Sequence, residues 1–274
     1  MSARLRNIAT ENERIVREGR YRTTANEVEV GDALAQSIAG TTLYQPGAFA
    51  GYPESRGNTT SVEVRAEDSI SAAVRLARRS NGFRIGVLNF ASARNPEGGY
   101  VNGAKAQEED VCRRTLLYPC LLAAPEFYTA HRARRDFRYS DRLIYAPQVR
   151  VIRDKTYAFE PEPARIDVFT CAAPNATALA RENPSAAGNL AGVLAERTRA
   201  VLGAAARHDA RMLVLGAWGC GVFGNDPAQV AEAFRIHLRG EFKHAFALVV
   251  FAVPDRGEDG SVRRTFQAAF PTHL

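Results

Sequence analysis

The chain has 274 residues, of which 46% are hydrophobic and 24% are charged, and its formal net charge is +6 at pH 7. A chain of this length can bury one large core or two small ones, and its charged fraction is ordinary for a globular protein. No segment approaches the ~20 apolar residues of a membrane span, and the first residues contain charged side chains without an apolar signal core. We therefore expect a cytoplasmic protein that does not engage a membrane.

Cysteine spacing and charge bear on the kind of site. The cysteines show no CxxC spacing and lie too far from the five histidines for a zinc pattern, which predicts buried, unreactive thiols and no metal site. Arginine is much commoner than lysine and is spread along the chain. The positive charge therefore favours an anionic ligand without identifying one, and a generally basic surface is an equal alternative.

Hydrophobic periodicity predicts helices alternating with strands. The predicted helices cover about 5–18, 69–80, a segment beginning near 107, 190–208 and 227–238. The predicted strands cover 61–65, 83–90, 143–147, 166–171, 211–215 and 245–253. Residues 27–53 show a mixed pattern, and residues 52–60, rich in Gly, Pro, Ser and Asn, predict a loop. Alternating elements with continuous apolar later strands predict a sheet covered on both faces, in one three-layer α/β/α domain.

A glycine loop with two adjacent glutamates follows the predicted strand 83–90. Residues 95–99 read Asn-Pro-Glu-Gly-Gly, and Gln107, Glu108 and Glu109 begin eight residues after the last glycine. Glycine lets main-chain N–H groups approach an anion, and neighbouring glutamates offer acid–base chemistry. The motif therefore indicates an enzyme that acts on a phosphorylated ligand. Arg113 and Arg114 follow Glu109 and Asp110 by four residues, where they can pair. The alternative is therefore that Glu108 and Glu109 form a solvated helix start paired with Arg113 and Arg114.

A second glycine loop, residues 219–224 (Gly-Cys-Gly-Val-Phe-Gly), matches GxGxxG between a predicted strand and a predicted helix. A Rossmann unit requires an acidic residue about 20 positions further on, whereas the nearest strand-end acid, Asp255, lies 31 residues after Gly224. A complete dinucleotide domain is therefore not expected. The glycine turn can still present amides to a pyrophosphate, although a tight connecting turn without a ligand is the alternative.

Together the two loops resemble a known family. Residues 89–99 with Gln107-Glu108-Glu109 are similar to the signature of bacterial-type poly(ADP-ribose) glycohydrolases, which is three glycines, a short spacer and Gln-Glu-Glu. Residues 216–225 resemble the diphosphate-binding loop of the same family. The resemblance covers about residues 60–254 and implies a macrodomain-like fold with a mixed central sheet. It also implies one catalytic domain over residues 1–274, on which residues 1–60 pack as a helical N-terminal extension.

The chain departs from this signature at one position. Glu97 stands where the family pattern has its first glycine. If the position requires a positive φ, glutamate is costly there. If its backbone is extended, the substitution only adds a local carboxylate.

The resemblance implies hydrolysis of the ribose–ribose O-glycosidic bond in poly(ADP-ribose), without a cofactor or a metal. It assigns Glu109 as the acid that protonates the leaving ribose oxygen and then activates water, and Glu108 as the residue that orients the adjacent ribose. Successive helical residues point about 100° apart, so two adjacent glutamates do not easily flank one sugar and unequal roles are expected. The remaining predicted substrate-binding residues are Asn95, Gly98, Gly99, Gln107, Gly219, Cys220, Gly221, Val222 and Phe223.

Alternatives remain for single residues and for the whole chain. Asn95 could instead form an Asn-Pro turn, and Phe223 could be an ordinary core residue. The protein could be a macrodomain that binds ADP-ribose without cleaving it, or a dinucleotide oxidoreductase. The expected partners are poly(ADP-ribose), ADP-ribose and ADP-ribosylated proteins, and we expect a monomer.

Overall fold

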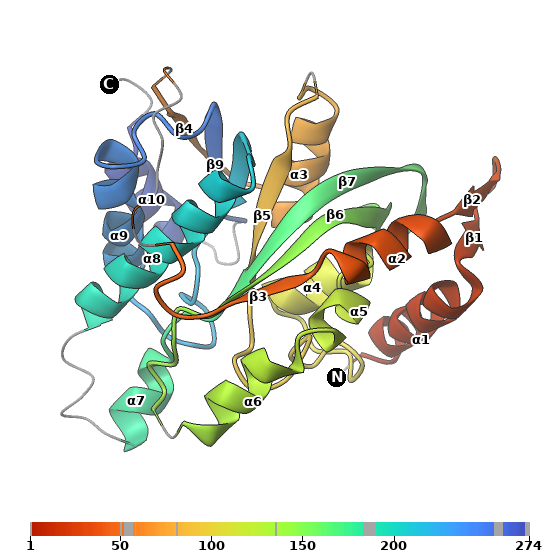
Figure 1. Ribbon diagram of the computed structural model, residues 1–274, viewed down its shortest axis with the longest axis horizontal. Helices are drawn as coiled ribbons and strands as arrows, with labels where there is room; N and C mark the ends of the chain where they lie inside the picture. Colours follow the sequence, from red (N-terminus) through yellow and green to blue (C-terminus); the bar gives the residue numbers. More distant parts are fainter. Residues whose placement is uncertain are drawn as a thin grey trace.

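A computed structural model describes residues 2–49, 51, 57, 59–80, 82–134, 136–182, 190–254 and 260–271. Its centre is a seven-stranded sheet with the order β3-β6-β7-β5-β8-β9-β4 (Figure 1). The strands are β1 (Arg20–Arg22), β2 (Glu27–Glu29), β3 (Thr42–Tyr44), β4 (Ser61–Arg65), β5 (Ile85–Phe90), β6 (Leu143–Arg153), β7 (Phe159–Cys171), β8 (Met212–Leu215) and β9 (Leu248–Ala252). The helices are α1 (Ala3–Glu18), α2 (Gly31–Ala39), α3 (Ser69–Ala77), α4 (Gln107–Arg114), α5 (Tyr118–Leu122), α6 (Pro125–Ala133), α7 (Ala176–Glu182), α8 (Leu190–Arg207), α9 (Pro227–Arg239) and α10 (Ser261–Ala269).

The sheet is mixed. Strands β7, β5, β8, β9 and β4 are parallel neighbours, and β6 pairs antiparallel with both β3 and β7. Parallel strands need crossover connections, which here run through helices on the two faces of the sheet. The predicted three-layer α/β/α fold with a mixed central sheet is confirmed.

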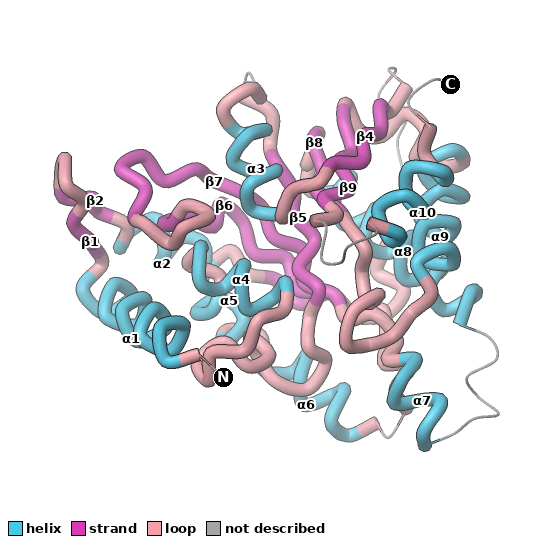
Figure 2. The backbone as a smooth tube through the Cα atoms, turned by 180° about the vertical axis from the view of Figure 1, so that it is seen from behind, coloured by secondary structure: helices cyan, strands magenta, loops and turns pink. Residues whose placement is uncertain are grey.

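Each face of the sheet has its own hydrophobic core, because successive side chains of a strand point to opposite faces. On β5, Leu88 packs into the cluster formed with α8, α9 and α10. Its neighbour Val87 packs into the cluster formed with α3, α4, α5 and α6. Figures 1 and 2 show these two helical layers from opposite sides, with α8 in front of the sheet in one view and α3 and α4 in front in the other.

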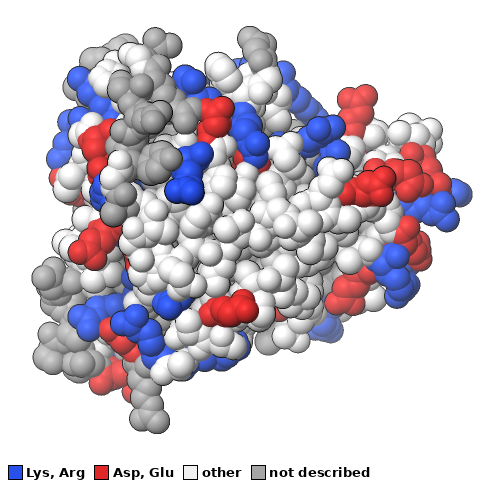
Figure 3. All heavy atoms as spheres, viewed as in Figure 1, with Lys and Arg blue, Asp and Glu red and all other residues white. Residues whose placement is uncertain are grey.

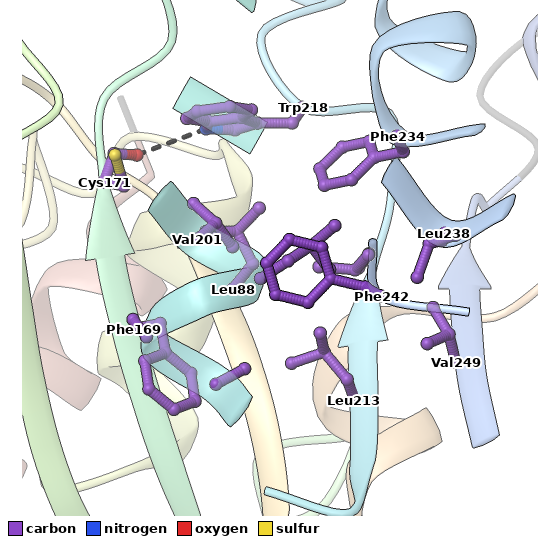
Figure 4. Close-up of a cluster of buried hydrophobic side chains, with 14 of the residues drawn as sticks. Leu88, Phe169, Cys171, Val201, Leu213, Trp218, Phe234, Leu238, Phe242 and Val249 are labelled. Atoms are coloured by element: carbon purple, nitrogen blue, oxygen red, sulfur yellow. Dashed lines mark hydrogen bonds between the residues drawn. The ribbon is translucent and has the colours of Figure 1, made fainter. Parts of the chain in front are cut away.

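The first core ends in an indole directly beneath the second glycine loop. The side chain of Trp218 is fully buried, and its Nε1–H donates to the carbonyl of Cys171 at 3.2 Å (Figure 4). Phe234 of α9 packs against the same indole, with ring centroids 6.3 Å apart. The loop that follows β8 therefore rests on a rigid, fully packed base.

The N-terminal helix packs against the segment that carries the first glycine loop. Asn12 of α1 donates to the carbonyl of Arg113 at 2.9 Å, and its Oδ1 accepts from Nε of Arg153 at 3.0 Å. Glu11 pairs with Arg153 at 2.6 Å, and the hydroxyl of Tyr100 donates to the carbonyl of Ala9. The extension therefore contacts the end of α4, strand β6 and the loop between β5 and α4.

Several elements differ from the sequence prediction. The mixed region 27–53 contains β2, α2 and β3, and β1, α5, α6, α7 and α10 were not predicted, because these elements are short. Strand β6 continues six residues beyond the predicted end at Pro147, since a register shift between Ala146 and Val149 accommodates the proline. Most of the predicted loop 52–60, and Asp255, lie outside the described residues.

Three global features bear on function. None of the described helices is long and apolar enough to cross a membrane. Within the described ranges, no group of three or more His, Cys, Asp or Glu side chains is placed to hold a metal ion. On the face shown in Figure 3, basic and acidic side chains are interspersed, so this face presents no single cationic tract.

Candidate active site

A cavity of about 590 Å³ opens at the carboxyl ends of the parallel strands. Its wall includes residues at or just after the ends of four of them, namely Phe90 at the end of β5, Ala173 after β7, Ala217 after β8 and Pro254 after β9. Ligands of open α/β sheets bind at this edge, because the loops that leave the strands converge there. Both glycine loops and the glutamate pair line this one cavity.

The first glycine loop is a series of tight turns that brings main-chain amides to α4. Gly98 has φ +63°, and a Cβ at this position would lie 2.7 Å from Oε1 of Glu109 and 3.2 Å from Oε2 of Glu108. Glycine is therefore required at this position by both the backbone conformation and the contact with the carboxylates. The preceding residue, Glu97, also has a positive φ of 69°. The structure therefore shows a positive φ, which is costly for glutamate, and not an extended backbone at this position.

Glu109 is held by main-chain donors on both sides. Its Oε1 accepts from the N–H of Gly99 at 3.0 Å, and its Oε2 accepts from the N–H of Ala106 at 2.9 Å. The second bond is the reach of an N3 glutamate back to the N-cap residue. Glu109 is 7% exposed and lines the cavity, so its carboxylate is immobilised at the cavity wall.

Glu108 lies deeper in the same wall and is 3% exposed. Its Oε1 accepts from Nδ2 of Asn89 at 3.0 Å, and its Oε2 accepts from the N–H of Ser92 at 2.7 Å. The pKa of Glu108 is raised to about 8, chiefly by burial and also by the nearby carboxylates of Glu109 and Glu97, against the opposite effect of these two hydrogen bonds. The raised pKa favours the protonated form of Glu108 at neutral pH.

Gln107 fixes the start of α4 against β5. Its Oε1 accepts from the N–H of Phe90 at 2.8 Å, while its Nε2 donates to Leu88 O at 2.9 Å and to Ser69 Oγ at 3.1 Å. Gln107 also lines the cavity. These bonds set the position from which the two glutamates project.

The arginines of α4 take partners other than the glutamate pair. Arg113 donates to the carbonyls of Tyr100 and Ala104, and it is 1% exposed. Arg114 pairs with Asp68 and, at 3.6 Å, with Asp110. Of the two expected i,i+4 pairs, the structure contains Asp110–Arg114. Glu108 and Glu109 are buried, so the solvated helix start considered as an alternative is wrong.

The second glycine loop has the geometry of a tight turn with open main chain at its tip. Gly219 has φ +73°, and a Cβ there would lie 2.6 Å from that of Ala173. Gly224 has φ +67° and contacts Thr177, whereas no atom lies within 4 Å of a Cβ built at Gly221. Asn225 closes the turn by donating to the carbonyls of Pro174 at 2.8 Å and Gly219 at 3.0 Å.

The side chains of the second loop take different positions. Val222 is 82% exposed, and Phe223 is half-buried at the cavity wall, 6.1 Å from the ring of Tyr139. Burial raises the pKa of the Cys220 thiol to about 12. This thiol remains protonated at neutral pH and is therefore a poor nucleophile.

The structure brings nearly all of the predicted site residues together. Every one of them lines the cavity except Gly99, which contributes the amide that holds Glu109. Sequence reasoning missed Asn89 and Ser92, the two residues that hold Glu108. Asn89 could have been found as a polar side chain within the otherwise apolar strand 85–90. It also missed further lining residues of the cavity, namely Asp68, Ser69, Gly260, Ser261, Val262 and Arg263.

Comparisons with known proteins agree on one family. The model of the microbial-type poly(ADP-ribose) glycohydrolase (PARG) catalytic domain matches residues 9–154. The crystal structure of PARG from Thermomonospora curvata is similar with a TM-score of 0.92 and 42% identity over 98% of this chain and 100% of that one. The same enzyme bound to the inhibitor ADP-HPD gives a TM-score of 0.90, with the same identity and coverage.

PARG from Deinococcus radiodurans in complex with ADP-ribose is similar with a TM-score of 0.83 and 40% identity, over 88% of this chain and 98% of that chain. Among curated proteins no match was found. The family model covers more than half of the chain, and the bacterial structures cover most or nearly all of it at 40–42% identity. The chain belongs to the microbial-type PARG family.

Proposed function

We propose that this protein hydrolyses the ribose–ribose O-glycosidic bonds of poly(ADP-ribose) and releases ADP-ribose. The observation that carries the proposal is the convergence of two buried glutamates and two glycine loops on one cavity, in a chain of the PARG family. The related enzymes crystallised with ADP-ribose and with ADP-HPD support the same ligand class.

Glu109 is the proposed general acid and base. A glycosidic bond breaks through an oxocarbenium-like state and needs a proton on the departing oxygen. Glu109 would give its proton to the leaving ribose oxygen as the C–O bond breaks, and its carboxylate would then take a proton from the water that adds to the sugar carbon. The N–H groups of Gly99 and Ala106 hold this carboxyl group in place through both steps.

Glu108 is the proposed ribose-positioning residue. Its buried carboxyl group is fixed by Asn89 and Ser92 and, with a pKa of about 8, is protonated at neutral pH. A fixed O–H donor can orient a ribose hydroxyl without adding a second negative charge beside Glu109. This separates the roles of two adjacent carboxyl groups.

The second glycine loop would hold the diphosphate. The backbone around Gly221 is open, and Gly219, Cys220, Gly221 and Val222 all line the cavity. The N–H of Cys220 donates to the carbonyl of Ala217 at 3.2 Å, so we expect the N–H groups of Gly219, Gly221 and Val222 to bind the phosphate oxygens. Phe223 would pack against the ribose, and Asn95, exposed at the cavity rim, would hold the sugar beside the scissile bond. Gly98 would line the cavity beside these groups, and Gly99 would act through the N–H that holds Glu109.

The rival function is a macrodomain that binds ADP-ribose without hydrolysis. Purified protein is incubated with poly(ADP-ribose), and the products are identified by mass spectrometry. We expect wild type to release ADP-ribose and Glu109→Gln to be about 10²–10⁴-fold slower, while ADP-ribose affinity changes little. Glu13→Gln, an exposed change on α1, is the control. A wild type that binds ADP-ribose but releases none from polymer would establish the rival.

The wider assignment follows from the same proposal. We propose one catalytic domain over residues 1–274 that acts as a monomer in the cytoplasm. ADP-ribosylated proteins would be its partners, and trimming of polymer made during the DNA damage response would be its setting.

A further inference from the structure

Glu97 is a buried carboxyl group that the mechanism above does not use. It occupies the first position of the family's glycine signature and adopts φ +69°, which costs a residue with a Cβ free energy relative to glycine. It is 7% exposed, and it does not line the cavity. A glutamate kept in a conformation that favours glycine, behind a catalytic carboxyl group, calls for a physical explanation.

The Glu97 side chain fastens the turn that holds Glu109. Its Oε2 accepts from the N–H of Val101 at 3.2 Å, and its carbonyl accepts from the N–H of Tyr100 at 3.2 Å. Gly99, which donates to Glu109 at 3.0 Å, lies inside this turn. A side-chain bond across residues 97–101 therefore limits the movement of the amide that positions the catalytic carboxyl group.

Glu97 also adds charge to the glutamate pair. The pKa of Glu97 is raised to about 7, because the upward effects of burial and of the negative charge of Glu109 exceed the downward effects of the N–H groups of Val101 and Tyr100 and of the Arg113 cation. Negative charges on Glu97 and Glu109 thus disfavour each other, and the interaction is reciprocal.

The surroundings provide little compensation for this charge. The titratable groups that interact with Glu97 are Glu108, Glu109, Cys112 and Arg113 on α4, Tyr118 on α5 and Tyr128 on α6. From α1, Glu13 acts on Tyr100 and Tyr118. Arg113 is the one cation in that set, and its guanidinium already donates to two carbonyls.

We propose that Glu97 is a positioning residue that acts through Glu109. Its carboxyl group fastens the turn that holds the Glu109 side chain. It also places a third buried carboxyl group beside the glutamate pair, where negative charges disfavour one another. The proposal rests on the proposed hydrolase function, because it concerns the positioning and the charge of the proposed general acid.

The pH dependence of kcat/KM on poly(ADP-ribose) tests the charge. Glu97→Gln keeps the size of the side chain and an acceptor oxygen but cannot ionise, and Glu97→Gly restores the residue that the backbone favours. With each profile normalised to its own maximum, we expect the basic limb of both variants about one pH unit below that of wild type. At pH values above the basic limb, the normalised activity of each variant is then about tenfold lower than that of wild type. Profiles that coincide with wild type and with the Glu29→Gln surface control would overturn the proposal.

The fastening of the turn is tested by comparing the two variants with each other. Glutamine can still accept from the N–H of Val101, whereas glycine cannot. We expect a kcat severalfold lower in Glu97→Gly than in Glu97→Gln, with KM nearly the same, because Glu97 does not line the cavity. Equal kcat values, or a difference confined to KM, would contradict this part.

A measurement without substrate separates this inference from the function. The folded protein disfavours ionised Glu97, so wild type loses stability relative to Glu97→Gln as the pH rises through about 7. We expect the Tm of Glu97→Gln to rise relative to the Tm of wild type by about 3 °C or more between pH 5 and pH 8.5. A constant difference would refute the charge effect even if wild type hydrolyses the polymer. An inactive wild type with a growing difference would refute only the function.

Discussion

At the scale of single residues, the site depends on amide N–H groups that hold buried carboxyl groups. Glu108 is held by Ser92 N–H and the side-chain amide of Asn89, and Glu109 by Gly99 N–H and Ala106 N–H. Such bonds position a carboxyl group without placing a cation beside it.

Gly98 is the residue at which this arrangement is most easily broken. A methyl group in Gly98→Ala would lie 2.7 Å from Oε1 of Glu109 and must displace that carboxylate. We expect kcat to fall about 10²-fold. Gly82→Ala is the matched control, because Gly82 also has a positive φ, +91°, but a Cβ there meets nothing within 4 Å. Both variants place a Cβ at a positive φ, and an equal loss of activity in both would show that the contact with Glu109 is not the cause.

The raised pKa of Glu108 predicts how stability varies with pH. Its folded-state pKa of about 8 lies above the ordinary value of 4.5, so the folded protein binds this proton more tightly than the unfolded chain. Wild type therefore loses this stabilisation as the pH rises from about 4.5 to about 8, whereas Glu108→Gln has none to lose. Urea unfolding should show Glu108→Gln gaining about 2–4 kcal/mol on wild type between pH 5 and pH 9. A pH-independent difference would show that Glu108 is ionised in the fold.

At the scale of elements, α4 is the part that organises the site. Gln107, the first residue of α4, is hydrogen-bonded to β5. At the other end of the helix, Asn12 of α1 donates to the carbonyl of Arg113. The helix is only eight residues long, and helices this short have little stability of their own. Its position therefore depends on these contacts with a strand and with the N-terminal extension.

Asn12→Ala tests the contribution of the N-terminal helix. The substitution removes the donor to Arg113 and leaves Nε of the buried Arg153 without the acceptor that Asn12 provides. An unsatisfied buried donor costs about 1–3 kcal/mol, so we expect the free energy of unfolding to fall by about 2 kcal/mol. Thr10→Ala, on an exposed position of the same helix, should change it by less than about 0.5 kcal/mol. Equal effects from the two changes would show that α1 does not fasten α4 through Asn12.

At the scale of the whole molecule, the cavity joins segments from opposite ends of the chain. Its wall runs from Asp68 through both glycine loops to Arg263. A ligand that fills it contacts the ends of strands β5, β7, β8 and β9 at once. Binding should therefore stabilise the complete fold rather than a single loop.

Ligand-dependent thermal unfolding measures this coupling and tests the oxidoreductase alternative. At an ADP-ribose concentration 100 times its Kd, we expect about 2.7 kcal/mol of added stability and a Tm increase of about 5–10 °C. NAD at the same concentration should give a smaller shift. An equal or larger shift with NAD would favour a dinucleotide-binding function.

The sequence by itself determined the fold class, the family and the two loops with the glutamate pair. These are local signals: glycines at defined spacing, acidic residues at a helix start, and apolar runs long enough to form buried strands. It did not reveal the short helices α2, α5, α6, α7 and α10, because helices this short gain most of their stability from packing.

Only the tertiary structure decided how the carboxyl groups differ. Adjacent in sequence, Glu108 and Glu109 are separated in character by the depth at which they are buried and by the donors that reach them from β5 and from the first loop. The structure also showed that Glu97 has the positive φ that its sequence position left open. The protonation of a carboxyl group depends on desolvation and on neighbouring charges, which are set by residues distant in the chain, so spacing alone could not determine it.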